Sequence, residues 1–385
     1  MRFQTVHTPT SLTEGPISQA LISFALPLLL GNLFQQLYNT ADSLIVGNFL
    51  GSEALAAVSS SGNLIFLMVG LVNGVSMGAG VVIARYFGAK DYDRIQKTIH
   101  TLLAFGLVAG ALLTVVGVAL SPVMLRLMDT PETVLPDSIS YFRTYFTGSL
   151  AFVLYNICMG ILQAVGDSRH PLQYLIISSL VNVVLDLLFV GVFHMGVWSA
   201  AAATAISQLV SMALCLLRLM RSERAYRVSL RKIRFDRRAL LEILQNGLPA
   251  GLQNSIISIG NVVVQSNINQ FGAAAMAGCG AYSKIEGFAF LPITSFTMAL
   301  TTYTSQNLGA REYGRAKKGA RFGIVCAMIL AEFIGFAMYA FMPYLAGFFS
   351  STPEVIRLAT NQTRTISLFY CLLAYSHAVS SVLRG

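Results

Sequence analysis

Long apolar runs separated by short polar breaks fill most of the chain. Most runs have about 20 residues or more, which is enough for a helix to cross the hydrocarbon core of a bilayer. The pattern predicts ten spanning helices, at residues 20–45, 54–83, 98–120, 139–165, 172–193, 197–219, 240–267, 275–304, 319–342 and 358–384. Runs of this length must satisfy their own backbone polar groups in lipid, so we expect an all-α integral membrane protein.

The chain also carries an internal duplication. Residues 88–94, Gly-Ala-Lys-Asp-Tyr-Asp-Arg, return 221 positions later at 309–315 as Gly-Ala-Arg-Glu-Tyr-Gly-Arg. Residues 25–27, Ala-Leu-Pro, return at 247–249 as Gly-Leu-Pro. A repeat of this length indicates two fused homologous bundles. With an even number of spans per bundle, the two are related by a parallel pseudo-twofold axis, an arrangement typical of transporters.

The duplication sets the expected domain organisation. We expect a cytoplasmic segment at 1–19, a first lobe of six helices at 20–220, a basic linker at 221–238 and a second lobe at 239–385. The first copy continues through two further spans beyond the point that matches the last residue of the second. We therefore expect twelve helices in the complete protein, of which about ten are present in a fragment.

The net charge of +9 follows membrane topology. Lysine and arginine gather at 85–97, 218–238 and 311–318, in loops on the same side as the N-terminus. Cytoplasmic loops carry this excess, so the N-terminus is expected inside the cell. The distribution argues against a nucleic-acid partner. The linker at 221–238 is either solvated or rests on anionic lipid headgroups.

Cysteine and histidine give no sign of catalysis or metal binding. All five cysteines lie in apolar runs, and their spacing suits neither a metal site nor a disulfide framework. His194 and His377 have no partner residue at a spacing typical of metal binding or catalysis. We expect no enzyme activity and no cofactor. Residues 1–19 show no cleavable signal, so the first span is expected to be retained.

Four polar side chains share one face of the first span. At about 100° per residue they fill an arc of about 100°. They are Gln35, Tyr38, Asn39 and Asp42. An ionisable residue inside a bilayer is costly and marks a functional site by default, so Asp42 is a candidate ion ligand. The other three are candidates for a substrate cavity, with polar contacts between helices as the alternative.

A second carboxylate lies at the same expected depth. Asp186 follows Asn182 by one turn on the fifth span, and Thr204 lies on the sixth. At about 1.5 Å per residue, Asp42, Asp186 and Thr204 all lie roughly 8–10 Å below the outer surface. Converging oxygen ligands suit Na⁺ or a shared proton. Hydrogen bonds within the bundle are the alternative for each residue.

The second copy carries its own charges. Lys284 and Glu286 are two positions apart and so point to different helix faces. Each is a candidate for a substrate cavity, and a local ion pair is the alternative. Glu332 either faces a solvent-filled space or pairs with Arg321. Valine occupies the positions equivalent to Asp42, so ion coupling is expected in the first copy alone.

Several segments resemble the multidrug and toxic compound extrusion (MATE) family, within the larger group of oligosaccharide and lipid flippases. They are Pro27 followed by Tyr-Asn-Thr-Ala-Asp at 38–42, the Gly-Ala-x-x-Tyr loops at 88–92 and 309–313, and Gln-Ala-Val-Gly-Asp-Ser at 163–168. The resemblance runs from about residue 15 to the end and is closest to the DNA-damage-inducible F-like branch.

The resemblance implies twelve helices and a cation site in the first lobe. In that branch an Asp on helix one, an Asn and an Asp four apart on helix five, and a Thr on helix six form the site. Asp42, Asn182, Asp186 and Thr204 match these places. The NorM-like branch has acidic residues on helices seven and ten, and this sequence has none there beyond Glu242 in the first turn of the seventh span.

These features predict a secondary active efflux antiporter in a bacterial cytoplasmic membrane. Inward movement of H⁺ or Na⁺ would drive export of amphiphilic or cationic small molecules as the two bundles rock between outward- and inward-facing states. We expect a monomer surrounded by membrane lipid. The alternative is a flippase for lipid-linked oligosaccharides or peptidoglycan precursors, which needs cationic cavity residues for pyrophosphate; Lys284 and Arg143 are the candidates. A scaffold has no use for two costly intramembrane aspartates.

Overall fold

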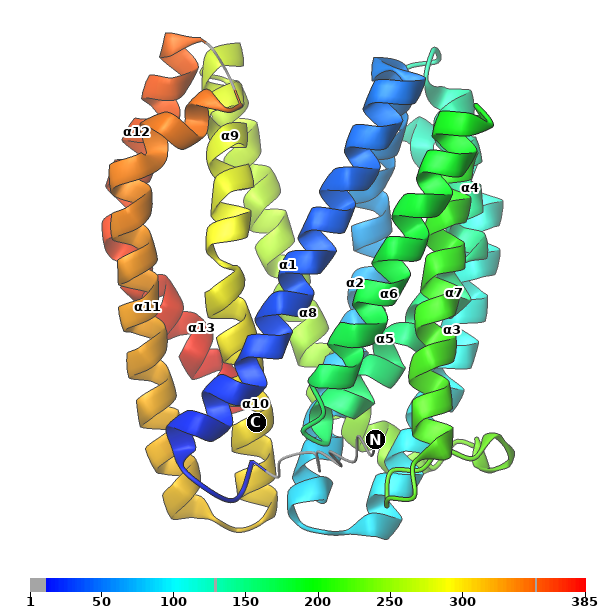
Figure 1. Cartoon of the computed structure of the whole chain (residues 1–385), viewed down its shortest axis with the longest axis vertical. Coiled ribbons are helices and arrows are strands. Elements are labelled where there is room, and N and C mark those ends of the chain that lie inside the picture. Colours follow the sequence, from blue (N-terminus) through cyan, green and yellow to red (C-terminus); the bar gives the residue numbers. More distant parts are fainter. Residues whose placement is uncertain (1–11, 128–129, 350–351) are drawn as a thin grey trace, which may run out of the picture. The chain divides into compact units, whose positions relative to one another are not determined.

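A computed structural model describes residues 12–127, 130–349 and 352–385, which form helices and no strand (Figure 1). The α-helices are α1 (Ile17–Leu50), α2 (Ser52–Gly88), α3 (Tyr92–Leu127), α4 (Leu135–Thr147), α5 (Ser149–Ala164), α6 (Arg169–Asp186), α7 (Trp198–Arg221), α8 (Arg237–Asn269), α9 (Ala273–Ala289), α10 (Leu291–Gly309), α11 (Tyr313–Gly347), α12 (Pro353–Ile366) and α13 (Tyr370–Arg384). Shorter elements are the π-helix η1 (Leu187–Val192) and the 3₁₀-helices η2 (Leu230–Lys232) and η3 (Ser367–Phe369). The expected all-α membrane fold is confirmed.

Each predicted span falls on one helix or on a broken pair. The fourth span is α4 and α5, which meet at Gly148 with a bend of 48°. Gly148 lies against the neighbouring α7, because a Cβ atom there would come 2.5 Å from the Ala205 methyl. Among the described residues, six helical stretches are long and apolar enough to cross a membrane, or seven if α4 and α5 form one span.

The duplication is visible in the backbone. Lys90 and Arg311, 221 positions apart, both adopt a left-handed conformation, with φ of 55° and 61°. Each lies in a loop closed by a backbone hydrogen bond between residues five apart. Gly51 and Gly272, also 221 apart, have φ of 91° and 90° before the next helix of each copy. Left-handed backbone is uncommon for residues other than glycine, so its recurrence at matching positions reflects common descent of the two halves.

The chain divides into two compact units. Among the described residues, unit 1 lies within 34–252 and unit 2 within 12–33 and 253–385. The division therefore falls inside α1 and α8, six residues after Pro27 and three after Pro249, the internal prolines through which the two helices continue. The lobe limits expected from the repeat remain a prediction.

Unit 1 is built around α5, which packs against α2, α3 and α7, while α6 packs along α7. Small residues bring its backbones close together: Gly74 and Gly78 of α2 meet Gly247 and Gly251 of α8. Close approach at small residues is how membrane helices gain packing energy, since lipid offers no hydrophobic drive.

In unit 2, α11 packs against α10, α12 and α13. The segment before α1 is held in this unit by side chains of α10 and α11. The Arg315 guanidinium donates to the carbonyls of Leu12, Glu14 and Gly15, and the Gln306 amide oxygen accepts from the Leu12 N–H. The Leu12 side chain is buried. This anchoring fixes the chain immediately before the first span.

The segment between α7 and α8, residues 222–236, is here called the strap. It is fixed to α3 by side-chain hydrogen bonds, which differs from a solvated linker. The Gln96 amide donates to the Ala225 and Arg227 carbonyls at 2.5 and 2.9 Å, and the Ser229 N–H donates to His100 Nε2 at 3.1 Å. Tyr226 and Val228 of the strap belong to the core of unit 1.

Candidate functional site

The two aspartates predicted to form an ion site lie against each other in unit 1. Asp42 comes from α1 and Asp186 is the last residue of α6, where the helix passes into the π-helix η1. Their carboxyl groups are close enough to share a hydrogen bond when one of them carries a proton. Asp186 is fully buried. Local π-helical turns occur frequently at functional sites, and this one follows the more buried carboxylate directly.

Asn182 and Thr204 lie beside this pair. The Asn182 amide donates to Thr204 Oγ1 at 3.4 Å, which links α6 to α7, and both side chains are buried. Tyr38, one turn before Asp42 on α1, reaches the Thr204 hydroxyl. All four residues that match the family's cation site are therefore gathered within one unit.

Several oxygens in this cluster are buried without a hydrogen-bond partner. They are Asp42 Oδ1, both carboxylate oxygens of Asp186 and Asn182 Oδ1. Within the described parts of the chain, the ion pairs do not involve either aspartate. A buried polar atom without a partner costs roughly 1–3 kcal/mol, and more when charged. Hard oxygens in this arrangement can hold a proton or a small hard cation such as Na⁺.

The rest of the polar face of α1 divides into two parts. Tyr38 is buried toward the aspartates, whereas Asn39 is exposed and Gln35 is half-buried. The Gln35 amide donates to Asn39 Oδ1 at 3.3 Å, across one helical turn. Gln35 and Asn39 thus form a separate polar pair, and their predicted role in a substrate cavity stays a prediction.

Sequence reasoning missed the tyrosines that border the aspartates. Tyr141 and Tyr145 of α4 lie near the cluster, and Tyr141 is close to both carboxylates. Tyr141 also packs with Val190 of η1 in a small buried cluster. The signal in the sequence was a pair of tyrosines spaced four apart inside an apolar span, which places both hydroxyls on one helix face.

Lys284 and Glu286 of α9 point in different directions, as their spacing predicted. Lys284 is exposed, and it makes no ion pair with the described residues. Glu286 is held by tyrosines: the Tyr282 hydroxyl donates to its Oε1 at 2.5 Å and the Tyr370 hydroxyl at 3.4 Å. A local Lys284–Glu286 ion pair, one alternative for these residues, is thus absent. Their place in a substrate cavity stays a prediction.

Glu332 of α11 makes no ion pair with Arg321 or with any other cation among the described residues. Its Oε2 accepts from the Cys371 N–H at 3.2 Å, at the first turn of α13. The first N–H groups of a helix lack partners within the helix, so a carboxylate here stabilises the break between η3 and α13.

We expect Tyr282→Phe to lower the stability of unit 2 by about 1–2 kcal/mol, because Glu286 keeps only the longer hydrogen bond from Tyr370. The midpoint of thermal unfolding of the purified protein measures the loss. Tyr344→Phe is the matched control, since Tyr344 is an exposed tyrosine of the same unit. Equal midpoints for the two variants would show that the tyrosine network does not stabilise the fold.

Comparison with known proteins agrees with this architecture. The MatE family matches residues 27–188 and 249–385, one segment in each repeat. The chain is 28% identical over 380 residues to the probable multidrug resistance protein YoeA of Bacillus subtilis, covering 97% of this chain and 82% of that protein. It is 26% identical to the FAD transporter of Shewanella oneidensis, covering 90% of this chain and 77% of the relative.

A solved transporter of the MOP superfamily from Pyrococcus furiosus superposes with a TM-score of 0.91 at 25% identity, covering 99% of this chain and 85% of that one. In that protein the binding pocket has reversed polarity, which suggests that its function differs. The family match spans most of the chain, and the fold and the duplicated loops agree with it. The chain belongs to the MatE family of membrane transporters.

Proposed function

We propose that the chain is a secondary active antiporter that exports amphiphilic or cationic small molecules in exchange for H⁺ or Na⁺ moving inward. The coupling ion binds at Asp42, Asn182, Asp186 and Thr204. Binding there favours one of two states, outward- or inward-facing, between which the two repeats rock. An ion drives such a cycle only if its affinity differs between the two states.

The unpartnered carboxylate oxygens of Asp42 and Asp186 carry this proposal. Two neighbouring carboxylates in an apolar bundle are costly when both are ionised, and a proton or cation between them removes that cost. Asn182 Oδ1 and the Thr204 hydroxyl add neutral oxygens on the same side. A purely structural role predicts saturated hydrogen bonding instead.

The names of the relatives support a small-molecule substrate and leave its charge open. YoeA is named a multidrug resistance protein, whereas the Shewanella protein is named for an anionic dinucleotide. A flippase of lipid-linked precursors is less well supported, because its candidate cations are unsuited. The Arg143 guanidinium donates to Ser121 Oγ at 3.1 Å and to the Val118 carbonyl at 3.3 Å. Lys284 is the single basic residue of α9, whereas a pyrophosphate calls for several.

Purified protein in liposomes with imposed gradients tests the proposal. We expect a pH gradient or a Na⁺ gradient to drive ethidium against its concentration gradient, and the matching ionophore to abolish the movement. Parallel vesicles loaded with FAD distinguish a cationic from an anionic substrate. Ethidium movement that is insensitive to both gradients and both ionophores contradicts the antiporter assignment.

A further inference from the structure

The strap and the first turns of α3 line a pocket that contains none of the residues of the proposed ion site. Its volume is about 350 Å³, within the range of small-molecule sites. Its charged lining consists of four cations and two carboxylates: Lys97, Arg231, Lys232, Arg234, Asp93 and Asp236. We call it the strap pocket. The excess of cations suits an anion.

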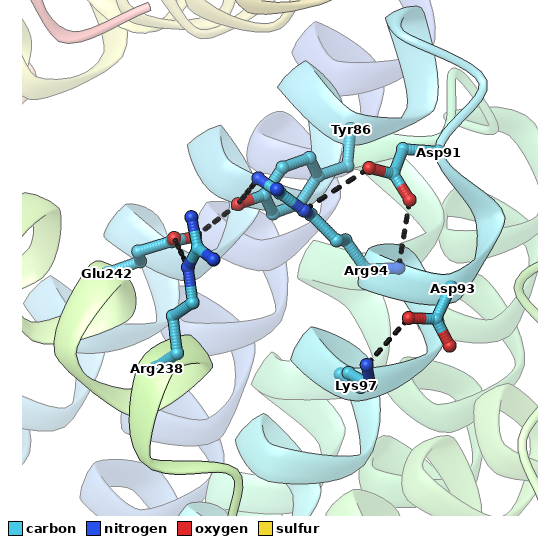
Figure 2. Close-up of polar contacts among 7 residues, drawn as sticks. All are labelled: Tyr86, Asp91, Asp93, Arg94, Lys97, Arg238 and Glu242. Carbon is cyan, nitrogen blue, oxygen red and sulfur yellow. Dashed lines mark hydrogen bonds and ion pairs between the residues drawn. The ribbon is translucent and has the colours of Figure 1, made fainter.

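The cations next to the strap are paired with carboxylates (Figure 2). Three ion pairs lie around the pocket: Arg94 with Asp91 at 3.3 Å, Lys97 with Asp93 at 2.6 Å, and Arg238 with Glu242 at 3.3 Å. In the described part of the chain, Arg231, Lys232 and Arg234 have no such partner. One of the two carboxylates is already engaged, because Asp236 Oδ1 accepts from the Ala239 N–H at 2.9 Å. With four cations against two carboxylates, the lining keeps a net charge of +2, carried on the strap side by Arg231, Lys232 and Arg234.

Like charges also approach each other at this site. The carboxylates of Asp93 and, less strongly, Asp236 raise the pKa of the Lys97 ammonium, and the nearby Arg234 guanidinium opposes that rise by a smaller amount. Repulsion between two cations is relieved when an anion binds between them. The arrangement therefore gains stability from a ligand of negative charge.

The pocket is built on a fixed backbone. Thr101 holds the strap on both sides of Phe235: its hydroxyl donates to the Arg234 carbonyl at 3.4 Å and accepts from the Asp236 N–H at 3.0 Å. The His100 ring uses both nitrogens, Nδ1 with the Gln96 carbonyl and Nε2 with the Ser229 N–H. A ligand meets a preorganised site, which reduces the entropy cost of binding.

Apolar side chains beside the cations favour a lipid over a soluble anion. Leu230 and Phe235 of the strap are about half exposed and flank the three cations in sequence. The pocket lies at the start of α3, directly before the apolar run at 98–120. Cations alternating with exposed apolar residues at this level are typical of segments that lie in the headgroup region of a membrane.

We propose that the strap pocket binds the phosphate group of an anionic phospholipid headgroup. Arg231, Lys232 and Arg234 contact the phosphate, and Leu230 and Phe235 enter the outer part of the acyl layer. The strap joins the two repeats, so the bound lipid secures their connection to the bilayer surface.

Thermal unfolding of the full chain in neutral detergent tests this proposal. The probes are phosphatidylglycerol, phosphatidylcholine with the same acyl chains, and inorganic phosphate. A ligand that binds only the folded protein raises the unfolding midpoint. The pocket variant is Arg231→Gln/Lys232→Gln/Arg234→Gln. The matched control is Arg221→Gln/Arg224→Gln/Arg227→Gln, which removes the same charge from exposed positions outside the pocket.

We expect phosphatidylglycerol to raise the midpoint of the wild type and the control. The pocket variant should need on the order of tenfold more lipid for the same rise, because each lost cation weakens attraction to an anionic surface. Equal responses of the two triple variants would overturn the proposal, as would a full shift with inorganic phosphate or phosphatidylcholine. If the pocket variant gives no folded protein, the three single substitutions provide the same comparison.

Discussion

Asp186→Asn is expected to abolish gradient-driven export while leaving the protein folded. Asparagine has nearly the shape of aspartate and keeps a polar group beside Asp42, but it can neither ionise nor exchange a proton. A gradient drives transport only if the ion binds one state more tightly than the other, and the variant lacks that difference in affinity. The substrate should then equilibrate, so the accumulation ratio in liposomes falls to about 1.

Asp42→Asn should have the same effect, because the two carboxyl groups lie within hydrogen-bonding reach of each other and are proposed to bind one ion. Once either is replaced, the second substitution should add little, since residues that act as a unit are not additive. Asp137→Asn is the control, removing an exposed carboxylate of α4. Gradient-driven accumulation that survives both substitutions at normal protein levels would make the aspartates structural.

Thermal unfolding of the wild type and Asp186→Asn in the presence of Na⁺ distinguishes the two candidate coupling ions. If Na⁺ is the ion, it should protect the wild type against thermal unfolding in a concentration-dependent way, and Asp186→Asn should lose that protection. Protection of the variant equal to that of the wild type would place the Na⁺ effect elsewhere. No Na⁺ effect on the wild type, together with transport driven by pH, would identify the proton.

The grouping of Asp42, Asn182, Asp186 and Thr204 could be foreseen because it rests on regular helix geometry. Rise per residue set their common depth, and the spacing of four put Asn182 and Asp186 on one face. The ten spans could also be predicted, because the length of an apolar run is a local feature of the sequence. The duplicated loops could be predicted from their repeated motifs.

What could not be foreseen depends on partners distant in sequence. Tyr141 borders the aspartates only because α4 packs across α7, and Glu286 meets Tyr370, which lies 84 positions away. From the sequence, the strap was expected to be either a solvated linker or a segment resting on anionic headgroups, because charged residues dominate its composition. Two of its side chains are buried in the core of unit 1, and its backbone donates to His100 and accepts from Gln96, both residues of α3. Tertiary contacts of this kind leave no periodic trace in one sequence.

Gly78→Ala is expected to prevent stable folding of unit 1. At Gly78 a Cβ atom would lie 2.3 Å from the Gly247 backbone nitrogen, and at Gly74 it would lie 2.6 Å from the Gly251 Cα. The obstructing atoms belong to backbone, so no side chain can rotate away to make room. One helix must shift along its length. We expect a loss of about 1–3 kcal/mol or more, the usual range for overpacking, and a low yield of folded protein.

Gly80→Ala provides the control, because it adds the same methyl group to the same helix where no other atom lies within 4 Å. Both variants remove one glycine from α2, so the gain in helix propensity is equal and only the collision with α8 differs. Monodispersity after detergent extraction and the unfolding midpoint give the comparison. Wild-type behaviour of Gly78→Ala would mean that α2 and α8 are farther apart than described. A defect confined to Gly78→Ala would establish the glycine contact between the first repeat and the beginning of α8.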